Sequence, residues 1–486
     1  MARWDDEADV VVVGYGGAGA AAALAAAERG AEVLVVEKQP QGRHTPSTKM
    51  GGGALMAVTD VEKATRYLDR CAAGMVPREV SRAWAGRALG VLDWLGRIAD
   101  VHYVKSVGAE HPEFDGADTV HSYAPARHAG TGYGHALFTQ LSAAVDRRKN
   151  VRVLFDAPGK RLVREDRRVT GVEVAEGGRT RRIGARRGVI LTTGGYEYDE
   201  QMKLNYLKGN PIYFYGNPGN TGDGVRLAQD VGADLWHMNQ MIGRAIAHFD
   251  LPDGFSLNCL VLIGGPHDLA RPAGYVITDR RGRWFANEHM QAMSRHDFYY
   301  LLLQYDPTTN DYPRNPCYWF FDERRMRIGP PVSTELGAPA HGYYDWSPNS
   351  EREIERGWIK RASSIEEAAA LAGVADPECA AQEVREYNAA CASGRDRFGR
   401  PPASLVPLDS PPFYCMPLYP GGSNTCGGPR RDEHARILDV FGGPIEGLYG
   451  AGELGEPVGL MYPSNGANIS DCMCFGQIAA EHALGA

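Results

Sequence analysis

The sequence contains no long hydrophobic run. None of its apolar stretches approaches the ~18 residues of a membrane span. The first of them follows the acidic leader at residues 1–7, which lacks the basic start of a signal peptide. Basic residues are not in excess either, because 52 Lys and Arg stand against 60 Asp and Glu. These absences predict a chain with no membrane span and no nucleic-acid partner.

Cysteine pairs are also missing. The nine cysteines are scattered, with no CxxC pair and no CxxCH haem-attachment motif. A disulfide framework is therefore not expected, and this cysteine usage favours a reducing, cytoplasmic compartment. The histidines show no metal-ligand spacing, so no metal site is predicted. The length of 486 residues, with 43% hydrophobic and 23% charged residues, indicates a globular protein of two or three domains.

What the sequence does contain is a dinucleotide-binding unit near its start. Four valines at 10–13 predict a strand buried on both faces. A GxGxxG turn and an alanine-rich helix follow, which would let a pyrophosphate approach the backbone and the helix N-terminus. The turn residues expected to contact the dinucleotide are Gly14, Gly16, Gly17, Ala18 and Gly19.

The unit is completed by an acid in the expected register. A second valine-rich strand at 33–36 ends at Glu37, which lies 23 residues beyond Gly14. A carboxylate at this place accepts hydrogen bonds from the adenosine ribose hydroxyls and disfavours a 2′-phosphate. Strand, turn, helix, strand and acid in this order make dinucleotide binding a firm prediction.

A second glycine-rich segment lies near the other end of the chain and points to a flavin. Residues 447–453 predict a strand running into a glycine turn that ends in the acid Glu453, which suits a ribityl hydroxyl. A helix is expected over 468–480, and its N-terminus suits the pyrimidine end of a reduced flavin. We therefore expect FAD, lined also by the polar loop 42–53.

Two further segments are compatible with a dinucleotide. The buried strand at 189–191 ends in a glycine pair, and residues 220–224 open a helix with an N-cap candidate. The remaining cofactor-binding residues that we predict are Lys38, Ser47, Thr48, Gly51, Gly52, Gly53, Ala157, Thr193, Gly194, Gly195, Asp223, Gly452, Glu453, Asn468 and Ile469.

From roughly 245 to 405 the chain loses its βαβ rhythm and becomes rich in Pro, Tyr and Arg. This change of texture predicts an inserted domain. Residues 363–387 are typical of two helices broken near Asp376, and 399–402 are expected to be a linker back to the first domain.

With these segments in hand, the chain resembles the fumarate reductase and succinate dehydrogenase flavoprotein family, in particular its 3-ketosteroid Δ1-dehydrogenase-like branch. The resemblance runs almost end to end. It rests on GYGGAG with Glu37, TTGGYEYD at 192–199, NTGDG at 220–224, GRWFANE at 282–288, NTCGGPRRD at 424–432 and GLYGAGELG at 447–455.

The resemblance implies an α/β fold with a doubly wound, Rossmann-like FAD-binding domain formed by residues 1–244 and 408–486. An inserted α+β cap at 245–407 would cover the substrate. The chemistry implied is the removal or addition of two hydrogens across a carbon-carbon bond beside a carbonyl or carboxylate.

The two branches of the family use different catalytic residues. In fumarate reductases an arginine after the NE of the cap motif delivers a proton, and Arg295 stands at a similar spacing after 287–288. An arginine needs a neighbouring acid and dry surroundings to exchange protons. His296 is the rival acid or base, because its ordinary pKa lies near ~6.5. Four cap tyrosines could also supply a base or line the pocket: Tyr299, Tyr300, Tyr318 and Tyr343.

The residues that clamp a dicarboxylate in fumarate reductases are not matched, because Asn424 and Pro463 stand near their places. Instead Tyr462 is followed four residues later by Gly466, as in the ketosteroid dehydrogenase branch. In that branch the tyrosine hydroxyl and the glycine N–H polarise a ketone oxygen. Donors on this oxygen stabilise the enolate as hydride leaves, so a neutral, bulky or cyclic carbonyl substrate is expected.

Several alternatives stay open. The same residues could run the reaction backwards as an ene-reductase, or the fold could serve as a flavin-binding module or an isomerase without net redox. His44 stands near the place of the flavin-linking histidine of succinate dehydrogenases, but its longer spacing to the next glycines favours non-covalent FAD. The electron donor or acceptor and the oligomeric state are not indicated by the sequence.

Overall fold

The computed structural model describes residues 3–125, 133–264, 273–292 and 295–485. The chain divides into two compact units. Unit 1 comprises residues 1–207, 217–241 and 424–486, and unit 2 comprises residues 208–216 and 242–423. Among the described residues, no helix combines the length and the apolar character needed to cross a membrane.

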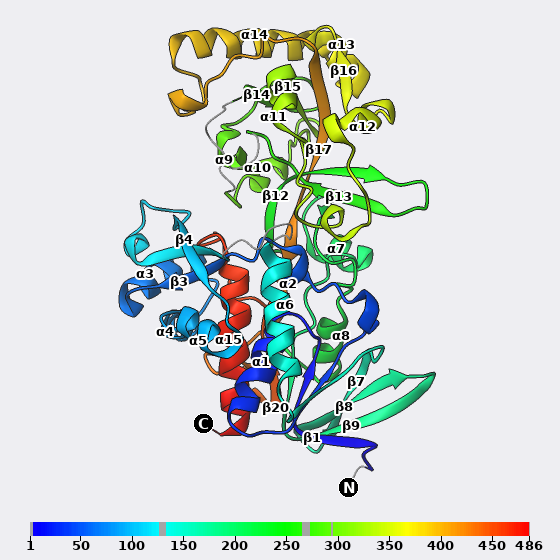
Figure 1. Ribbon diagram of the computed structural model, residues 1–486. Helices are drawn as coiled ribbons and strands as arrows, with labels where there is room; N and C mark the ends of the chain where they lie inside the picture. Colours follow the sequence, from blue (N-terminus) through cyan, green and yellow to red (C-terminus); the bar gives the residue numbers. More distant parts are fainter. Residues whose placement is uncertain (1–2, 126–132, 265–272, 293–294, 486) are drawn as a thin grey trace. The chain divides into compact units, whose positions relative to one another are not determined.

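Unit 1 is built on a largely parallel sheet, which confirms the predicted α/β fold class. Its parallel strands are β6 (Val151–Leu154), β2 (Val33–Val36), β1 (Asp6–Val13), β9 (Arg179–Leu191) and β20 (Pro444–Gly450), in that spatial order along one path. In Figure 1 the labelled strands β1, β9 and β20 lie at the base of this unit. The strand β2 and the second half of β1, residues 10–13, are wholly apolar and buried, as both-face coverage requires.

Antiparallel strands extend this sheet at one side. They are β7 (Gly159–Glu165), β8 (Arg168–Glu176) and β19 (Arg436–Leu438). A separate three-stranded sheet contains β3 (Leu55–Val58), β5 (Val120–Pro125) and β4 (Tyr103–Gly108), and β11 (Leu235–Trp236) pairs with β18 (Gly428–Pro429). The helices of unit 1 are α1 (Gly17–Glu28), α2 (Ser47–Met50), α3 (Val61–Ala72), α4 (Arg78–Ala88), α5 (Val91–Ala99), α6 (Tyr133–Asp146), α7 (Glu200–Tyr206), α8 (Asp223–Asp230) and α15 (Ala467–Leu484).

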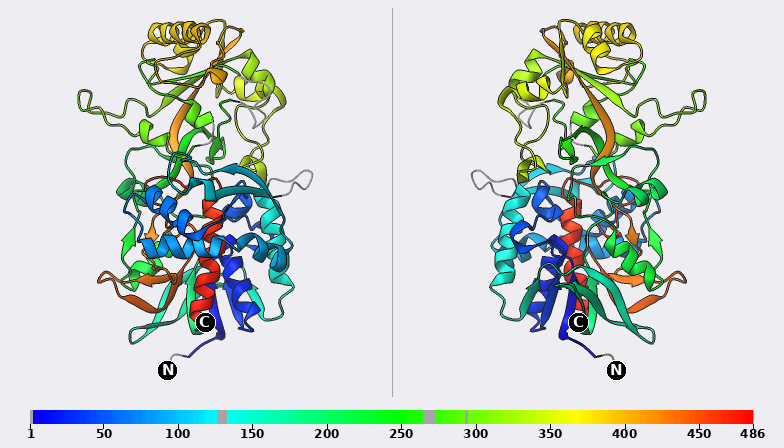
Figure 2. Two further views of the ribbon diagram at one scale, coloured as in Figure 1. Left: turned by 90° about the vertical axis from the view of Figure 1, so that its left-hand side faces the viewer. Right: turned by 90° about the vertical axis from the view of Figure 1, so that its right-hand side faces the viewer.

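The first and last helices of unit 1 pack side by side. Figure 2 shows α15, in red, beside the blue N-terminal elements that include α1. The contact is close because Gly476 of α15 faces α1. A Cβ atom at Gly476 would lie 2.9 Å from the Ala18 carbonyl oxygen and 2.9 Å from the Ala21 Cβ. Two alanine- and glycine-rich helix faces therefore bring both glycine turns of the sequence into one unit.

Unit 2 contains a mixed sheet in the order β13 (Ser256–Leu260), β12 (Met241–Asp250), β17 (Phe413–Thr425), β15 (Cys317–Asp322) and β14 (Tyr275–Thr278). The short strands β10 (Tyr213–Phe214) and β16 (Lys360–Ala362) also pair with β17. Its helices are α9 (His289–Ala292), α10 (Tyr299–Leu302), α11 (Glu323–Ile328), α12 (Glu351–Glu355), α13 (Ile365–Ala372) and α14 (Pro377–Ser393). Asp376 caps α14 by accepting the Cys379 N–H, so the predicted helix break lies where the cap is.

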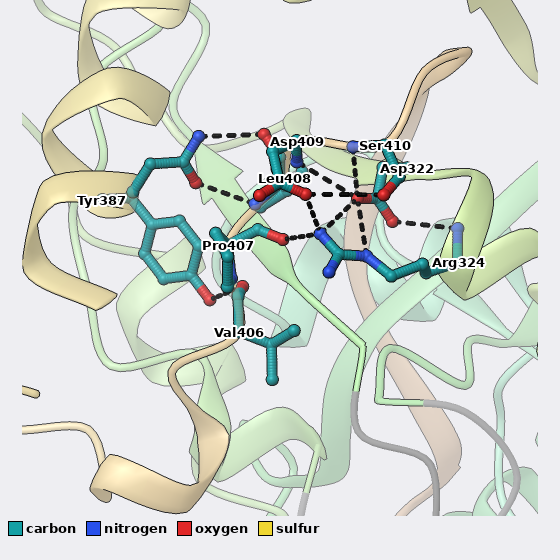
Figure 3. Close-up of polar contacts among 9 residues, drawn as sticks. Asp322, Arg324, Tyr387, Val406, Pro407, Leu408, Asp409 and Ser410 are labelled. Atoms are coloured by element: carbon teal, nitrogen blue, oxygen red, sulfur yellow. Dashed lines mark hydrogen bonds and ion pairs between the residues drawn. The ribbon is translucent and has the colours of Figure 1, made fainter. Parts of the chain in front are cut away.

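The segment expected to be a linker, 399–402, is instead built into unit 2. Arg400 is 3% exposed and donates to the carbonyl oxygens of Tyr275 and Ser404. Residues 406–410 are also held by hydrogen bonds and an ion pair, as Figure 3 shows. The contacts are Tyr387 Oη to the Val406 carbonyl, Arg324 to the Pro407 carbonyl and the Asp409 carboxylate, and the Asp409 and Ser410 N–H groups to Asp322. Composition alone indicated a linker because proline and glycine are common in both settings.

Candidate FAD site and active site

The glycine turn after β1 has the geometry that dinucleotide binding requires. Gly14 has φ of +103°, and a Cβ atom there would lie 2.5 Å from the Thr192 carbonyl oxygen. A Cβ atom at Gly19 would lie 2.1 Å from the Gly14 carbonyl oxygen, so close packing of α1 requires glycine there. At Gly16 a Cβ atom would meet only Pro46, at 3.8 Å. Packing does not explain this third glycine, whereas the approach of a pyrophosphate does.

Glu37 is fixed at the end of β2 by backbone donors. Its Oε2 accepts the Tyr15 N–H at 2.8 Å, and its Oε1 accepts the Gln39 N–H at 2.7 Å. The residue is 6% exposed, and this burial raises the pKa of its carboxyl while the two N–H groups lower it. The carboxyl is thus held in one orientation beside the glycine turn, which suits a ribose hydroxyl.

His44 lies at this same end of the site. Its ring stacks on Tyr15 with the centroids 5.4 Å apart, and its Nε2 lies 3.8 Å from Glu37 Oε2. Burial lowers the pKa of His44 to about 4, with a smaller contribution from the Lys49 charge. His44 is therefore a neutral imidazole at neutral pH.

Asn220 joins three segments of the site, and it was not among the residues that we predicted. Its Nδ2 donates to Ser47 Oγ at 3.0 Å and to Glu453 Oε2 at 3.1 Å. A Cβ atom at Gly194 would lie 2.6 Å from Asn220 Oδ1, so the predicted glycine pair makes room for this side chain. Asn220 is the first residue of the NTGDG motif, which pointed to this segment. Its contacts are with residues far away in the sequence, so motif spacing could not predict them. The N-cap of α8 is Gly222, with no side-chain cap, so neither Asn220 nor Thr221 caps it.

Replacing Asn220 with alanine should weaken FAD binding about tenfold, because about 1.4 kcal/mol is the sum expected for two lost hydrogen bonds. The dissociation constant can be measured by fluorescence quenching as FAD is added back to the apoprotein. Asn150→Ala is the matched control, since Asn150 also makes two hydrogen bonds, to the Ala27 and Ala31 carbonyls. An equal loss of affinity in both variants would contradict a specific role of Asn220.

Other residues of this region that we predict to bind the cofactor form hydrogen bonds within the protein. Lys38 Nζ contacts Asp223 Oδ2 at 2.6 Å and Thr221 Oγ1 at 2.9 Å. The Gly17 N–H, at the start of α1, donates to Thr48 Oγ1 at 2.9 Å. These contacts connect the loop that follows β2 to the starts of α1 and α8.

The acid of the second glycine turn, Glu453, is partly buried. Burial and then the charge of Glu197 raise the pKa of Glu453 to about 8, so its carboxyl holds a proton at neutral pH. It can then donate as well as accept a hydrogen bond at a ribityl hydroxyl. Glu197 was missed by sequence reasoning, although it lies in the TTGGYEYD motif. It is 1% exposed, and its Oε1 accepts the Thr425 N–H at 2.6 Å.

The structure brings Tyr462 and Gly466 together at the N-terminus of α15. Gly466 is the N-cap with φ of +89°, and a Cβ atom there would lie 2.4 Å from the Ala54 carbonyl carbon. The Tyr462 hydroxyl accepts the Asn468 N–H at 3.0 Å. Burial, and then the charge of Glu456, raise the pKa of Tyr462 well above its ordinary value. This phenol therefore stays protonated, which suits a hydrogen-bond donor and not a base.

Arg295 and His296 belong to unit 2. Arg295 Nη2 lies 2.7 Å from Asp297 Oδ2, so the neighbouring acid that proton exchange needs is present. His296 Nε2 lies 2.6 Å from Arg244 Nη2. A guanidinium can only donate, so His296 offers a lone pair at Nε2 and is neutral. Arg244, 7% exposed, was not predicted.

Parallel sheet, glycine turn, fixed acid and second glycine turn define a dinucleotide-binding flavoprotein. The match to known families agrees: residues 9–469 match the family described as "FAD binding domain". The chain belongs to this family, and its cofactor is FAD. It is an FAD-dependent oxidoreductase of the kind that acts on CH–CH bonds.

Two curated proteins and one solved structure are particularly similar. The chain is 28% identical to the 3-oxosteroid 1-dehydrogenase of Mycobacterium tuberculosis, with 98% of each chain aligned. It is 29% identical to the 4-oxocyclohexanecarboxylate 2-dehydrogenase of Sinomonas cyclohexanicum over 72% of this chain, and the alignment spans 61% of that protein. The fold matches 3-ketosteroid Δ1-dehydrogenase from Sterolibacterium denitrificans, crystallised with 1,4-androstadiene-3,17-dione. Its TM-score is 0.85 at 23% identity, over 99% of this chain and 100% of that one.

Proposed function

We propose that this protein desaturates the Cα–Cβ bond beside a ketone in a cyclic or steroid-like substrate. The Tyr462 hydroxyl and the Gly466 N–H would hold the ketone oxygen and stabilise the enolate that forms as the α-proton leaves. A base near Arg295 and His296 would take this proton. When bound, FAD supplies the site that accepts the β-hydrogen as hydride.

The observation that carries this proposal is the placement of two donors at one helix end. Tyr462 is held by the Asn468 N–H, and Gly466 is the N-cap of the same helix, α15. The positive end of a helix dipole favours developing negative charge, as on an enolate oxygen. The named ketone substrates of the two curated relatives support the same class of substrate.

A second candidate is the reverse reaction, in which an ene-reductase saturates the bond. It is favoured by the Arg295–Asp297 ion pair, because an arginine beside an acid can pass a proton to an α-carbon. The carbonyl donors would be the same in both directions.

Further parts of the proposal concern the rest of the chain. Residues 245–407 would cap the substrate. FAD would be held non-covalently, since His44 lies against Glu37, the residue assigned to the adenosine ribose. All nine cysteines are free thiols, which supports a reducing cytoplasm. The electron acceptor would be a separate carrier or partner.

An anaerobic absorbance titration tests the function and its direction. Saturated cyclic ketones, 3-ketosteroids and 4-oxocyclohexanecarboxylate are added to the oxidised holoprotein, and their enone counterparts to the chemically reduced one. Bleaching of the oxidised flavin by a saturated ketone is the expected result. Reoxidation by enones without any bleaching by ketones would make the enzyme a reductase. A flavin that responds to neither set would contradict the proposal.

A further inference from the structure

A buried carboxyl group, that of Glu456, lies near Tyr462 and has no role in the proposed desaturation. Glu456 is 0% exposed, and it follows the second glycine turn by a few residues. Asn424 Nδ2, also fully buried, donates to Glu456 Oε2 at 3.3 Å. Burial of a carboxyl group costs free energy unless hydrogen bonds compensate for the lost hydration, so a fully buried glutamate points to a specific role.

The Asn468 side chain lies between this carboxyl and the tyrosine. With its amide nitrogen toward Glu456, Asn468 donates to Glu456 Oε1 at 2.7 Å and to Tyr462 Oη at 3.1 Å. In this orientation the amide oxygen lies 3.2 Å from Asn424 Nδ2, which donates to it, and 2.5 Å from Asn424 Oδ1. The two hydrogens of one NH₂ group thus serve two acceptors.

These contacts fix the direction of the tyrosine proton. The Tyr462 oxygen accepts from Asn468 twice, through the backbone N–H and the side-chain amide. These two donors meet lone pairs of the oxygen, so the hydroxyl proton points away from Asn468. We propose that Glu456 is a positioning residue, which holds the Asn468 amide so that the Tyr462 hydroxyl donates to the substrate carbonyl. This inference rests on the proposed role of Tyr462.

The charge of Glu456 matters as well as its position. Burial raises the pKa of Glu456 well above its ordinary value. The charges of Asp471 and Glu453 add to this rise, whereas Arg431 and the Asn424 hydrogen bond lower the pKa. The titratable and charged groups around it are Asp471, Glu453, Arg431, Cys426 and Tyr462. The neutral acid keeps Tyr462 a good donor, whereas an ionised Glu456 would oppose any negative charge on the substrate oxygen. Activity should therefore fall as pH rises through the pKa of Glu456.

The test compares pH profiles of kcat for the wild type, E456Q and Y462F holoproteins. We expect wild-type kcat to fall about tenfold when Glu456 ionises, since a unit charge at this range acts on the enolate. E456Q should lower kcat about threefold at neutral pH through one weakened hydrogen bond, and should lack the alkaline fall. N468A should lower kcat about tenfold. E446Q is the matched control, because Glu446 is a solvent-exposed glutamate paired with Arg168.

A readout independent of turnover is the infrared band of protonated carboxyl groups. This band should lose intensity in E456Q at neutral pH but not in E446Q. If Y462F lowers kcat while the E456Q profile stays parallel to that of the wild type, the role of Glu456 is wrong and the proposed function stands. If Y462F leaves kcat unchanged, the proposed function fails, and this inference fails with it.

Discussion

Replacing Tyr462 with phenylalanine should lower kcat about 10²- to 10³-fold, which is the usual loss when one donor to a developing oxyanion is removed. The substrate carbonyl is only weakly basic in the ground state, so KM should change much less than kcat. The hydroxyl accepts the Asn468 N–H, and the substitution removes a single oxygen atom, so the fold should survive. The measurement is steady-state turnover with an artificial electron acceptor, at matched FAD content.

The control for this variant is Tyr305→Phe, since Tyr305 is 47% exposed and its hydroxyl donates only at the surface, to Asn310. Its kcat should equal that of the wild type. An unchanged kcat in Y462F would remove the assignment of Tyr462 as the carbonyl donor. Gly466 cannot be probed in the same way. Any side chain there meets the Ala54 backbone at 2.4 Å and a φ of +89°, so a loss of activity would report distortion.

The local parts of the site could be predicted from the sequence. Gly14, Gly19 and Glu37 follow one another through a single strand–turn–helix–strand unit, so a local pattern of residue types marks them, although the clash that requires glycine at 14 is with the distant Thr192. The glycine pair at 194–195 and the acid Glu453 were also found, because each follows directly from a buried strand. In these cases the local order of strand and turn is enough to mark the position.

The missed residues act across long sequence distances. Asn220 contacts Ser47 and Glu453, which lie 173 and 233 residues away, and Glu456 contacts Asn424, 32 residues away. No periodicity or spacing links such positions, since only the packed sheet brings them together. The prediction of a linker at 399–402 was wrong for a related reason. Arg400 is buried against the Tyr275 carbonyl, and Tyr275 belongs to strand β14, which lies far earlier in the chain.

Breaking the Arg431–Asp471 pair should cost unit 1 much of its stability. The two side chains are fully buried, with Nη2 and Oδ1 2.8 Å apart. Arg431 also donates to the carbonyl oxygens of Gly450 and Gly452, in the second glycine turn. Asp471→Leu would leave a buried guanidinium without this carboxylate, and such a loss costs about 3–5 kcal/mol. The free energy of unfolding should fall accordingly, and FAD should dissociate at lower temperature.

The opposite variant, Arg431→Met, should be milder at acidic and neutral pH, because a carboxyl group can take up a proton whereas a guanidinium cannot lose one. Burial raises the pKa of Asp471 from an ordinary value of 3.8 to about 6 even with Arg431 beside it. Without Arg431 the folded-state pKa would rise further. The folded protein then binds this proton more tightly than the unfolded chain does. Stability is therefore fully present below about pH 4 and is lost as pH rises through the folded-state pKa.

Thermal unfolding of both variants from pH 5 to 8 measures this asymmetry. R431M should lose stability steadily across that range, D471L should be low throughout, and the double variant R431M/D471L should recover most of the loss because no buried charge is left from the pair. Equal destabilisation of the two single variants at every pH would contradict this asymmetry, because it would mean that protonation of Asp471 does not relieve the loss of Arg431.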